Sequence, residues 1–396
     1  MKKILIIFHN NFLNNTLGCN SYIFEIARHL KSRGCQIDFF STDRVWNNFD
    51  DFDCCNSKHG GIVSNFHLNK SEAVEKRYLQ IGKFCLCSIK RDSVSSDGFG
   101  WVTRHAGAEL QRMLDENDYD FVHVHYIQMA EILKYVKISS RTKLVYGAQD
   151  ALYIMMGYYQ SGLRGMMSIL PREMEILKLF DKVLCISYDE MRMFRLLLPE
   201  TDFRFIPHML SRKVLPQRDK AYDVLFLGFK NPHNKEGVKW FVEKVMPFAE
   251  RKWRVAVCGR VWEAIDKDEP GFVDFARMRG VVRIDFADDL DELYAQTRMS
   301  ICPLLGGTGM KIKTIDSMAR GIPVVSTSYG VDGFPDKLEN GCLVADTPEE
   351  FSAYIDRMLS DDVFYANQRK KMIAYFDAHL SRDVVAPVLD DVFELN

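Results

Sequence analysis

The sequence predicts an α/β protein with two domains, each built on a parallel sheet. Three observations lead to this prediction. At 396 residues the chain exceeds the size at which a single core usually keeps growing. Short apolar runs without polar alternation, typical of strands buried on both faces, alternate with stretches of helical periodicity. Residues 299–328 combine both signals in one strand, turn, helix and strand.

Residues 301–333 carry the most informative part of this unit. The apolar run over residues 299–305 predicts a strand, and the turn Gly-Gly-Thr-Gly at residues 306–309 follows it. Apolar side chains then recur at helical spacing until Gly321, where the helix is expected to end. Residues 323–328 predict a second strand. Such a turn presents backbone N–H groups and a helix N-terminus, which together bind anions.

Two lysines, Lys311 and Lys313, fall in the first turn of the predicted helix. The helix dipole disfavours cations at this end of a helix. Lysines at these positions therefore indicate that an anion docks on the turn, with ordinary surface lysines as the alternative.

The composition is that of a soluble globular protein, with 47% hydrophobic and 27% charged residues. A formal net charge of −2 argues against a nucleic-acid-binding protein, which normally carries a basic excess. The ten cysteines form no C-x-x-C pair and are expected to be reduced thiols. The first apolar run is too short for a signal peptide, and no stretch approaches the ~18 apolar residues of a membrane span. We therefore expect a cytoplasmic protein, at most peripheral to the inner membrane.

The first half alternates strands and helices, which predicts a parallel sheet. We expect strands over residues 3–8, 36–41, 121–126, 143–146 and 182–187, and helices over 21–33, 104–117, 172–180 and 188–197. The loop after the first strand has one glycine, Gly18, and lacks the G-x-G-x-x-G fingerprint of NAD enzymes. Ligands of open α/β sheets bind beyond the carboxyl ends of the strands, which makes His125, Gln149 and Asp150 candidate site residues. Each of the three, taken alone, suits a structural role equally well.

Three stretches of the first half leave alternatives open. Residues 70–92 hold six Lys/Arg against three acids, which fits either a solvated face or a surface for an anionic lipid-linked acceptor or a membrane. Residues 157–171, rich in aromatic residues and methionine, suit either an acceptor- or membrane-facing loop or buried packing. Four residues of metal-ligating type lie at spacings that fit no standard structural zinc site: Cys54, Cys55, His59 and His67.

The second half repeats the alternation after a charged, proline-containing stretch, residues 205–218, which predicts the linker between domains. We expect strands over 223–228, 253–259 and 281–286, helices over 238–250 and 288–296, and a terminal helix with an apolar face over 384–393.

The glycine-rich stretch resembles the donor-binding segment of the retaining nucleotide-sugar glycosyltransferases of family 4, the group 1 glycosyltransferases. Many of these read PL-x-x-G-x-G-x-K-x-K-x-[LI]-E-[AS]-M-A-x-G-x-P-V-V-[AS]-T. The following residues fill that pattern: Pro303, Leu304, Gly307, Gly309, Lys311, Lys313, Ile315, Ser317, Met318, Ala319, Gly321, Pro323, Val324, Val325, Ser326 and Thr327.

The resemblance implies the GT-B fold, in which two Rossmann-like parallel-sheet domains face each other across a cleft. It implies an acceptor-binding domain over residues 1–206, a nucleotide-sugar donor-binding domain over 207–376, and a terminal helix, 377–396, that crosses back to the first domain.

The resemblance also assigns roles to individual residues. Donor-binding residues are expected to be Gly228, Lys230, Asn234, Phe286, Gly307, Thr308, Gly309, Met310, Lys311, Lys313 and Asp316. Catalytic residues are expected to be Lys311, Lys235, Gln149 and His125, and the acceptor side is expected to include Gly18, Cys19 and Asp150.

Four positions depart from the family pattern. Thr308 and Asp316 stand where many members carry the two glutamates of Glu-x7-Glu, and Asp316 shortens the reach towards the donor ribose by one methylene. Phe229 takes the place of an arginine that grips the donor diphosphate, and Gln149 that of a histidine. A glutamine forms hydrogen bonds but does not titrate at physiological pH.

The function implied is retaining transfer of a sugar from a nucleotide-diphosphate donor to a saccharide or lipid-linked acceptor, in surface polysaccharide or glycoconjugate synthesis. The resemblance implies no metal and no cofactor, because the leaving diphosphate takes the acceptor proton. The sequence gives no signal for an oligomeric state. Two alternatives stay open: a related protein that binds without catalysis, and, more remotely, a phosphorylase or epimerase on the same scaffold.

Overall fold

The computed structural model describes residues 1–14, 18–42, 52–69, 76–81, 84–89, 102–156 and 162–395. The chain divides into two compact units. The first unit comprises Met1–Cys185, Met191–Phe205 and Leu389–Asn396, and the second comprises Ile186–Glu190 and Ile206–Val388.

The first unit is built on a seven-stranded sheet in the order β3-β2-β1-β6-β7-β8-β9, all of whose pairings are parallel. Its strands are β1 (Lys3–Ile7), β2 (Gln36–Thr42), β3 (Asn65–Asn69), β6 (Phe121–His125), β7 (Lys143–Ala148), β8 (Lys182–Cys185) and β9 (Asp202–Phe205). β1 and β6 lie near the middle and are almost entirely buried, as their continuous apolar runs predict.

The helices of this unit follow the strands. They are α1 (Gly18–Ser32), α2 (Phe52–Lys58), α3 (Arg104–Glu116), α4 (Ile127–Ala130), a 3₁₀ turn at Glu131–Tyr135, α5 (Leu152–Met156), α6 (Leu163–Leu177) and α7 (Tyr188–Leu197). The first residues of α7, up to Glu190, belong to the second unit, and the rest of the helix belongs to the first. The start of α3 is fixed by a side-chain cap, since Thr103 Oγ1 accepts a hydrogen bond of 3.0 Å from the N–H of Ala106.

The last residues of the chain pack within the first unit. Phe393 is fully buried and its ring lies 5.2 Å from the ring of Phe121. His29 Nε2 lies 2.8 Å from Asp390 Oδ1, and Arg33 Nε lies 3.2 Å from the same oxygen. Apolar contact and charge therefore hold this segment together.

The second unit is built on a six-stranded parallel sheet in the order β12-β11-β10-β13-β14-β15. Its strands are β10 (Tyr222–Leu227), β11 (Val255–Cys258), β12 (Val281–Ile284), β13 (Thr297–Cys302), β14 (Val324–Ser326) and β15 (Leu343–Val344).

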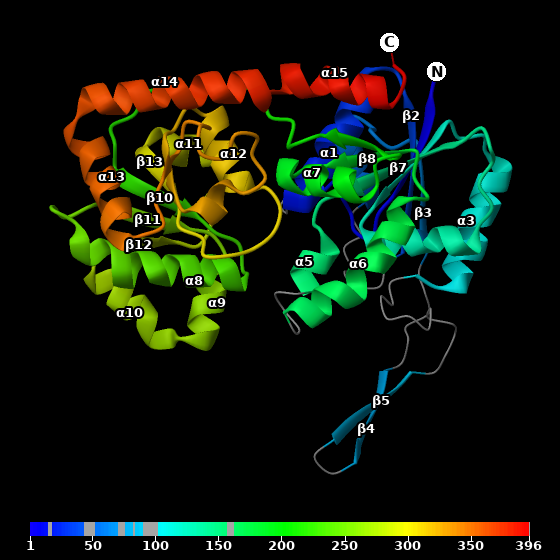
Figure 1. The fold of residues 1–396 in the computed structure, drawn as a ribbon, viewed down its shortest axis with the longest axis horizontal. Coiled ribbons are helices and arrows are strands. Elements are labelled where there is room, and N and C mark those ends of the chain that lie inside the picture. The colour runs from blue at the N-terminus through cyan, green and yellow to red at the C-terminus, as the bar shows by residue number, and fades with distance from the viewer. Residues whose placement is uncertain are drawn as a thin grey trace. The chain divides into compact units, whose positions relative to one another are not determined.

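Helices cover both faces of this sheet. They are α8 (Pro232–Trp240), continued by a π turn at Phe241–Val245 and a 3₁₀ turn at Met246–Phe248, then α9 (Val261–Asp268), α10 (Pro270–Met278), α11 (Leu290–Ala295), α12 (Ile312–Ala319), α13 (Pro348–Ser360) and α14 (Asp362–His379). The last helix, α15 (Arg382–Val392), begins in the second unit and ends in residues of the first. In Figure 1, α11 and α12 lie on one side of the sheet and α8, α9 and α10 on the other.

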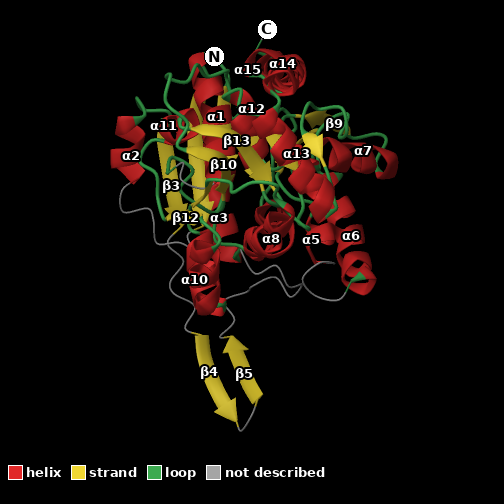
Figure 2. Ribbon diagram, turned by 90° about the vertical axis from the view of Figure 1, so that its left-hand side faces the viewer, coloured by secondary structure: helices red, strands yellow, loops and turns green. Residues whose placement is uncertain are grey.

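A third, two-stranded antiparallel sheet pairs β4 (Lys76–Ile81) with β5 (Phe84–Ile89), seen in Figure 2 as two arrows of opposite direction. These strands are the described part of the basic stretch 70–92; residues 70–75, 82–83 and 90–92 lie outside the described residues.

Three sequence predictions about elements were wrong. The helix expected over residues 172–180 begins earlier, at Leu163, as α6. The leucines, methionines and arginine of residues 163–171 favour a helix, which passes through Gly165 and continues beyond Pro171. Residues 157–161 lie outside the described residues. α1 begins at Gly18 rather than residue 21. α8 begins at Pro232 rather than residue 238, because Asn231 caps it and proline suits the first helical position.

Among the helices in the described ranges, none is both long enough and apolar enough to cross a lipid bilayer.

Candidate functional site in the second unit

The candidate site lies where two neighbouring strands of the second unit end. β10 pairs with β13 in parallel, so the carboxyl ends of both strands meet at one edge of the sheet. Gly228 follows β10, and the glycine-rich turn at residues 306–309 follows β13. The topology therefore brings together two loops that are about 80 residues apart in the chain.

The turn requires glycine at two positions. Gly307 has a φ of 108° and Gly309 a φ of 67°, in the region that side chains disfavour. A Cβ atom at Gly307 would also lie 3.3 Å from Cδ2 of His233. The backbone of the turn thus approaches the start of α8 closely.

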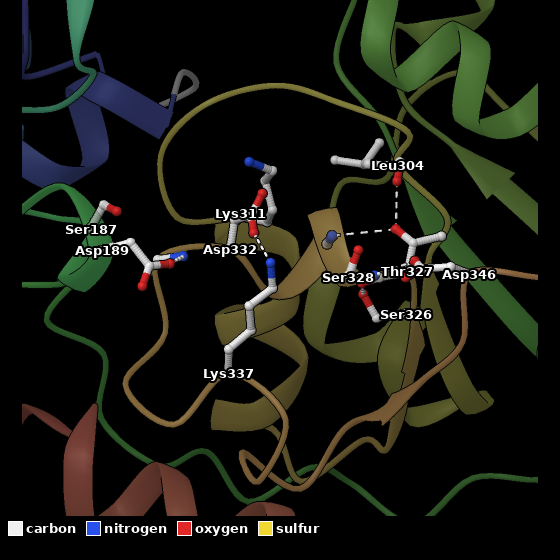
Figure 3. Close-up of polar contacts among 12 residues, drawn as sticks. Ser187, Asp189, Leu304, Lys311, Ser326, Thr327, Ser328, Asp332, Lys337 and Asp346 are labelled. Carbon is white, nitrogen blue, oxygen red and sulfur yellow. Dashed lines mark hydrogen bonds and ion pairs between the residues drawn. The ribbon is translucent and has the colours of Figure 1, made fainter. Parts of the chain in front are cut away.

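Lys311 stabilises the shape of the turn. Its Nζ donates hydrogen bonds of 2.9 Å to the carbonyl oxygen of Thr308 and 2.8 Å to that of Gly309. Lys311 is buried, at 9% exposure. It occupies the N-cap position of α12, on the loop before that helix (Figure 3). A buried ammonium group is therefore fixed beside the backbone that is expected to meet an anion.

The first turn of α12 keeps donors available. Within the described part of the chain, the backbone N–H groups of Met310, Ile312 and Lys313 donate no hydrogen bond to the protein. Unsatisfied N–H groups at a helix N-terminus attract anions, and the helix dipole adds to the attraction.

Lys313 lies beside the first loop. Its Nζ donates to Oδ1 of Asn234 and lies 4.4 Å from the centre of the Phe226 ring. The pKa of Lys313 is lowered to about 8, mainly by burial, with Cys302 opposing the shift and the charge of Lys311 adding to it. Asn234 is itself fixed, because its Nδ2 donates to the carbonyl oxygen of Phe229 at 2.9 Å.

The carboxylate of Glu190 also reaches the turn, a contact that the sequence did not predict. Glu190 belongs to the second unit, is 5% exposed, and its Oε1 accepts a hydrogen bond of 3.2 Å from the N–H of Gly309. The two residues are 119 positions apart, and no local pattern marks Glu190.

Asp316 lies one turn into α12 and contacts a second residue that the sequence did not predict, Arg320. Arg320 Nη1 donates to Oδ1 of Asp316, and Nε of Arg320 donates to Oδ1 of Asp291 at 2.7 Å. Burial raises the pKa of Asp316, and the charge of Arg320 opposes the rise.

Residues around the first loop form surface pairs. Lys230 Nζ lies 3.3 Å from Glu263 Oε2, and the guanidinium of Arg260 lies over the Phe229 ring with Cζ 5.2 Å from its centre. Arg260 was not predicted as a site residue. Its guanidinium lies beside Phe229, the residue that stands where many family members carry an arginine. Gly228 packs tightly, since a Cβ there would lie 2.6 Å from Cε1 of Phe226.

Two further predicted residues lie on the surface of this unit. Lys235 Nζ is paired with Asp268 Oδ2 at 2.7 Å, and this hydrogen bond raises the pKa of Lys235. Phe286 follows β12 and is 75% exposed, so that its ring is available to a flat partner such as a base. The roles of both residues stay predictions.

A hydroxyl network fixes the next strand end. Thr327 Oγ1 donates to the carbonyl oxygen of Leu304 (Figure 3). The same oxygen accepts from the N–H of Gly330 at 3.3 Å. Thr314 Oγ1 of α12 donates to the carbonyl oxygen of Gly330 at 3.0 Å. The strand before the glycine turn, the strand after α12, and α12 itself are thereby tied together.

Candidate residues in the first unit

The first unit gathers the residues expected on the acceptor side at the ends of β6 and β7. Tyr126 OH donates to Oε1 of Gln149 at 3.3 Å. Burial raises the pKa of the Cys19 thiol. A hydrogen bond with Tyr126 opposes this rise, and the negative charge of Asp150 adds to it. Gly18 begins α1 next to Cys19.

Tyr126 was not predicted, and its backbone is unusual. Its φ is 67° and its ψ 134°, a conformation that costs a residue with a Cβ of order 1–3 kcal/mol and that often marks a functional position. No sequence signal points to it, because the strain comes from the tertiary structure.

His125 lies in the core. It is fully buried, its ring centre is 4.1 Å from that of His123, and a Cβ at Gly147 would lie 2.3 Å from its Nδ1. Among the described residues no hydrogen-bond partner is found for either ring nitrogen of His125 or of His123. Burial lowers the pKa of both imidazoles, to about 3 for His123. The catalytic role of His125 stays a prediction.

In the described ranges no group of three or more His, Cys, Asp or Glu side chains is arranged to hold a metal ion.

Comparison with known proteins

Two family models match the chain. The model described as Glycosyltransferase Family 4 matches residues 17–211, and the model described as Glycosyl transferases group 1 matches residues 221–361. Together they span most of the chain, one on each side of the linker, and the chain belongs to this family of glycosyltransferases.

One curated relative is a Klebsiella pneumoniae protein described as an uncharacterized 44.6 kDa protein in the cps region. It is 24% identical over 250 residues, which are 57% of this chain and 62% of the relative. The alignment therefore spans less than two thirds of the relative's length.

Three solved structures have the same fold. HepE of Anabaena, in complex with UDP, has a TM-score of 0.71 at 12% identity and is covered over 100% of both chains. A mutant of TarM from S. aureus, in complex with fondaparinux, alpha-GlcNAc-glycerol and UDP, has a TM-score of 0.69 at 9% identity, over 99% of this chain and 100% of that one. Sucrose-phosphate synthase of Thermosynechococcus elongatus has a TM-score of 0.69 at 14% identity, over 100% of this chain and 98% of that one. The predicted class, two parallel-sheet α/β domains of the GT-B type, is confirmed.

Proposed function

We propose that this protein is a glycosyltransferase that moves a sugar from a nucleotide-diphosphate donor to a saccharide or lipid-linked acceptor, with retention at the anomeric carbon. The proposal includes synthesis of a bacterial surface polysaccharide or glycoconjugate as the setting, and a reaction that needs neither a metal nor a cofactor. Support comes from the family match, from neighbours solved with UDP, and from the relative in a cps region.

One observation carries the donor assignment. The backbone N–H groups at the start of α12, which donate no hydrogen bond to the described residues, lie together with the ammonium groups of Lys311 and Lys313 at the carboxyl ends of two neighbouring strands. A diphosphate is the ligand whose charge suits this set, because backbone donors, a helix N-terminus and lysines each favour phosphate oxygens.

In the proposed reaction the bond between the anomeric carbon of the donor and its diphosphate oxygen breaks. The acceptor oxygen forms a bond to that carbon on the same face, and the acceptor proton passes to the departing diphosphate. Charge then builds up on the diphosphate, and Lys311, Lys313 and the α12 N–H groups would stabilise it.

A second candidate is a protein of the same family that binds a nucleotide without catalysis. The contact of Glu190 with Gly309 favours it, because a carboxylate there would compete with an anionic ligand for one N–H group. Release of UDP from UDP-sugars, measured with EDTA present and with a panel of acceptors, distinguishes the candidates: binding without any turnover supports the second.

A thermal-shift screen with UDP, GDP, ADP, dTDP and CMP tests the donor assignment. We expect UDP to raise the melting temperature most, since a ligand at about 100 times its Kd adds about 2.7 kcal/mol, or roughly 5 °C or more for a unit of this size. Absence of a shift with all five nucleotides would refute the proposed function.

The pKa of Lys313 leads to a pH-dependent affinity for UDP. Lys313 is largely protonated below its pKa of about 8 and loses its charge above it, so affinity is expected to fall as the pH rises through 8. Titration calorimetry between about pH 7 and about pH 9.5 should show a weakening of about 10-fold, the size of one charge-assisted contact.

Lys313→Arg is the control for this prediction. An arginine stays charged throughout the range, so its affinity should be flat with pH. A wild-type affinity that does not change across the range would contradict the assignment of Lys313 to the diphosphate.

A further inference from the structure

Among the described residues, hydrogen bonds are found to one of the two carboxylate oxygens of Asp316. Oδ1 accepts from Nη1 of Arg320, while within the described chain no hydrogen bond to Oδ2 is found. The Asp316 side chain is 20% exposed. The side chain is therefore not closed off from a ligand, while its first oxygen is held.

Arg320 is fixed on every side. Its side chain is 5% exposed, and its Nη1 also donates to the carbonyl oxygen of Asp316 at 3.1 Å. Nη2 lies 2.6 Å from Oδ1 of Asp291, and Cζ lies 4.7 Å from the centre of the Tyr294 ring. An arginine held by a carboxylate, a carbonyl and an aromatic face has little freedom.

Asp291 is held in turn. Lys213 Nζ donates to both of its carboxylate oxygens, at 3.0 and 2.8 Å, and Lys213 N–H donates to the carbonyl oxygen of Ala319. The four charged groups, two carboxylates and two cations, balance, which makes burial of the ion pair tolerable.

We propose that Arg320 is the positioning residue of Asp316: it fixes the aspartate so that the second oxygen accepts hydrogen bonds from the hydroxyl groups of the donor ribose. This inference rests on the proposed function. Without Arg320 the aspartate would rotate among its rotamers, and burial would favour its neutral form, which is a poorer acceptor.

The test compares the binding of UDP and of 2′,3′-dideoxy-UDP by titration calorimetry. In the wild-type protein UDP should bind about 10-fold more tightly, because the dideoxy compound lacks the hydroxyl groups that Asp316 accepts from. In Arg320→Gln this ratio should fall to about 2, as it should in Asp316→Asn, and the double variant should show no further fall.

Two more variants keep the result interpretable. Arg320→Lys retains the charge but not the planar fork, so its ratio should be intermediate. Arg254→Gln removes an arginine from a surface pair with Asp223 in the same unit, at 2.6 Å, and should leave the ratio at its wild-type value.

The outcomes separate the inference from the function on which it rests. A wild-type ratio in Arg320→Gln, or an equal loss for both nucleotides with the ratio unchanged, would overturn the positioning role while UDP binding by the wild-type protein still supports the donor site. If the wild-type protein binds neither nucleotide, the proposed function itself fails and this inference with it.

Discussion

Replacing Lys311 by methionine is expected to lower the rate of sugar transfer about 100- to 1000-fold, the usual effect of removing one donor that stabilises developing charge. The substitution keeps an unbranched side chain, one atom shorter, but removes its charge. It also leaves the carbonyl oxygens of Thr308 and Gly309 without their present donor. The turn would lose both its shape and its charge.

The measurement is the initial rate of UDP release from the UDP-sugar that the wild-type protein uses. Lys244→Met, which changes an exposed lysine of the second unit, is the matched control and should keep the wild-type rate. Lys311→Arg should recover part of the activity, because it restores the charge. A wild-type rate in Lys311→Met would remove Lys311 from the site.

The Gly330→Ala variant is expected to lose about 3 kcal/mol or more of folding stability. A Cβ at Gly330 would lie 2.1 Å from Oγ of Ser326 and 2.5 Å from the carbonyl oxygen of Cys302. Both atoms belong to buried strand ends that cannot move far. The hydrogen bonds of Gly330 with Thr327 and Thr314 would be strained as well.

Gly271→Ala is the control. Gly271 lies in the first turn of α10 with open space around its Cα, so an alanine there should be neutral or stabilising by about 0.4–1 kcal/mol. Urea unfolding of both variants, followed by tryptophan fluorescence, measures the difference. Equal midpoints for Gly330→Ala and the wild-type protein would show that this strand end is more loosely packed than described.

Much of the fold is predictable from local patterns. The strands before and after the glycine turn, and the helix between them, lie within a few residues of their predicted bounds, because buried parallel strands and amphipathic helices leave strong periodic signals. The start of α8 was missed although Asn231 and Pro232 are ordinary start signals. The apolar periodicity of this helix becomes visible only from residue 238 onward, after its first turn.

The candidate site was only partly predictable, for a physical reason. Gly307, Gly309 and Lys311 lie in one short segment, and their spacing alone indicates a turn for an anion. Glu190 reaches that turn from 119 residues away, and nothing in a linear pattern records such a contact. Arg320 lies four residues after Asp316, a spacing that brings two helical side chains to the same face, so this pair is one that the sequence could predict.

The C-terminal segment of the chain determines which fragment of the first unit can fold in isolation. The strands and helices up to residue 205 do not complete it, because Leu389–Asn396 belongs to it as well. This segment supplies the buried ring of Phe393, which packs on Phe121, and the carboxylate of Asp390, which contacts His29. A fragment that ends after the linker would lack this segment and would expose part of its hydrophobic core to solvent. A fragment of the first unit with a complete core must therefore include residues 389–396, these last eight residues being either fused after residue 205 or added as a separate peptide.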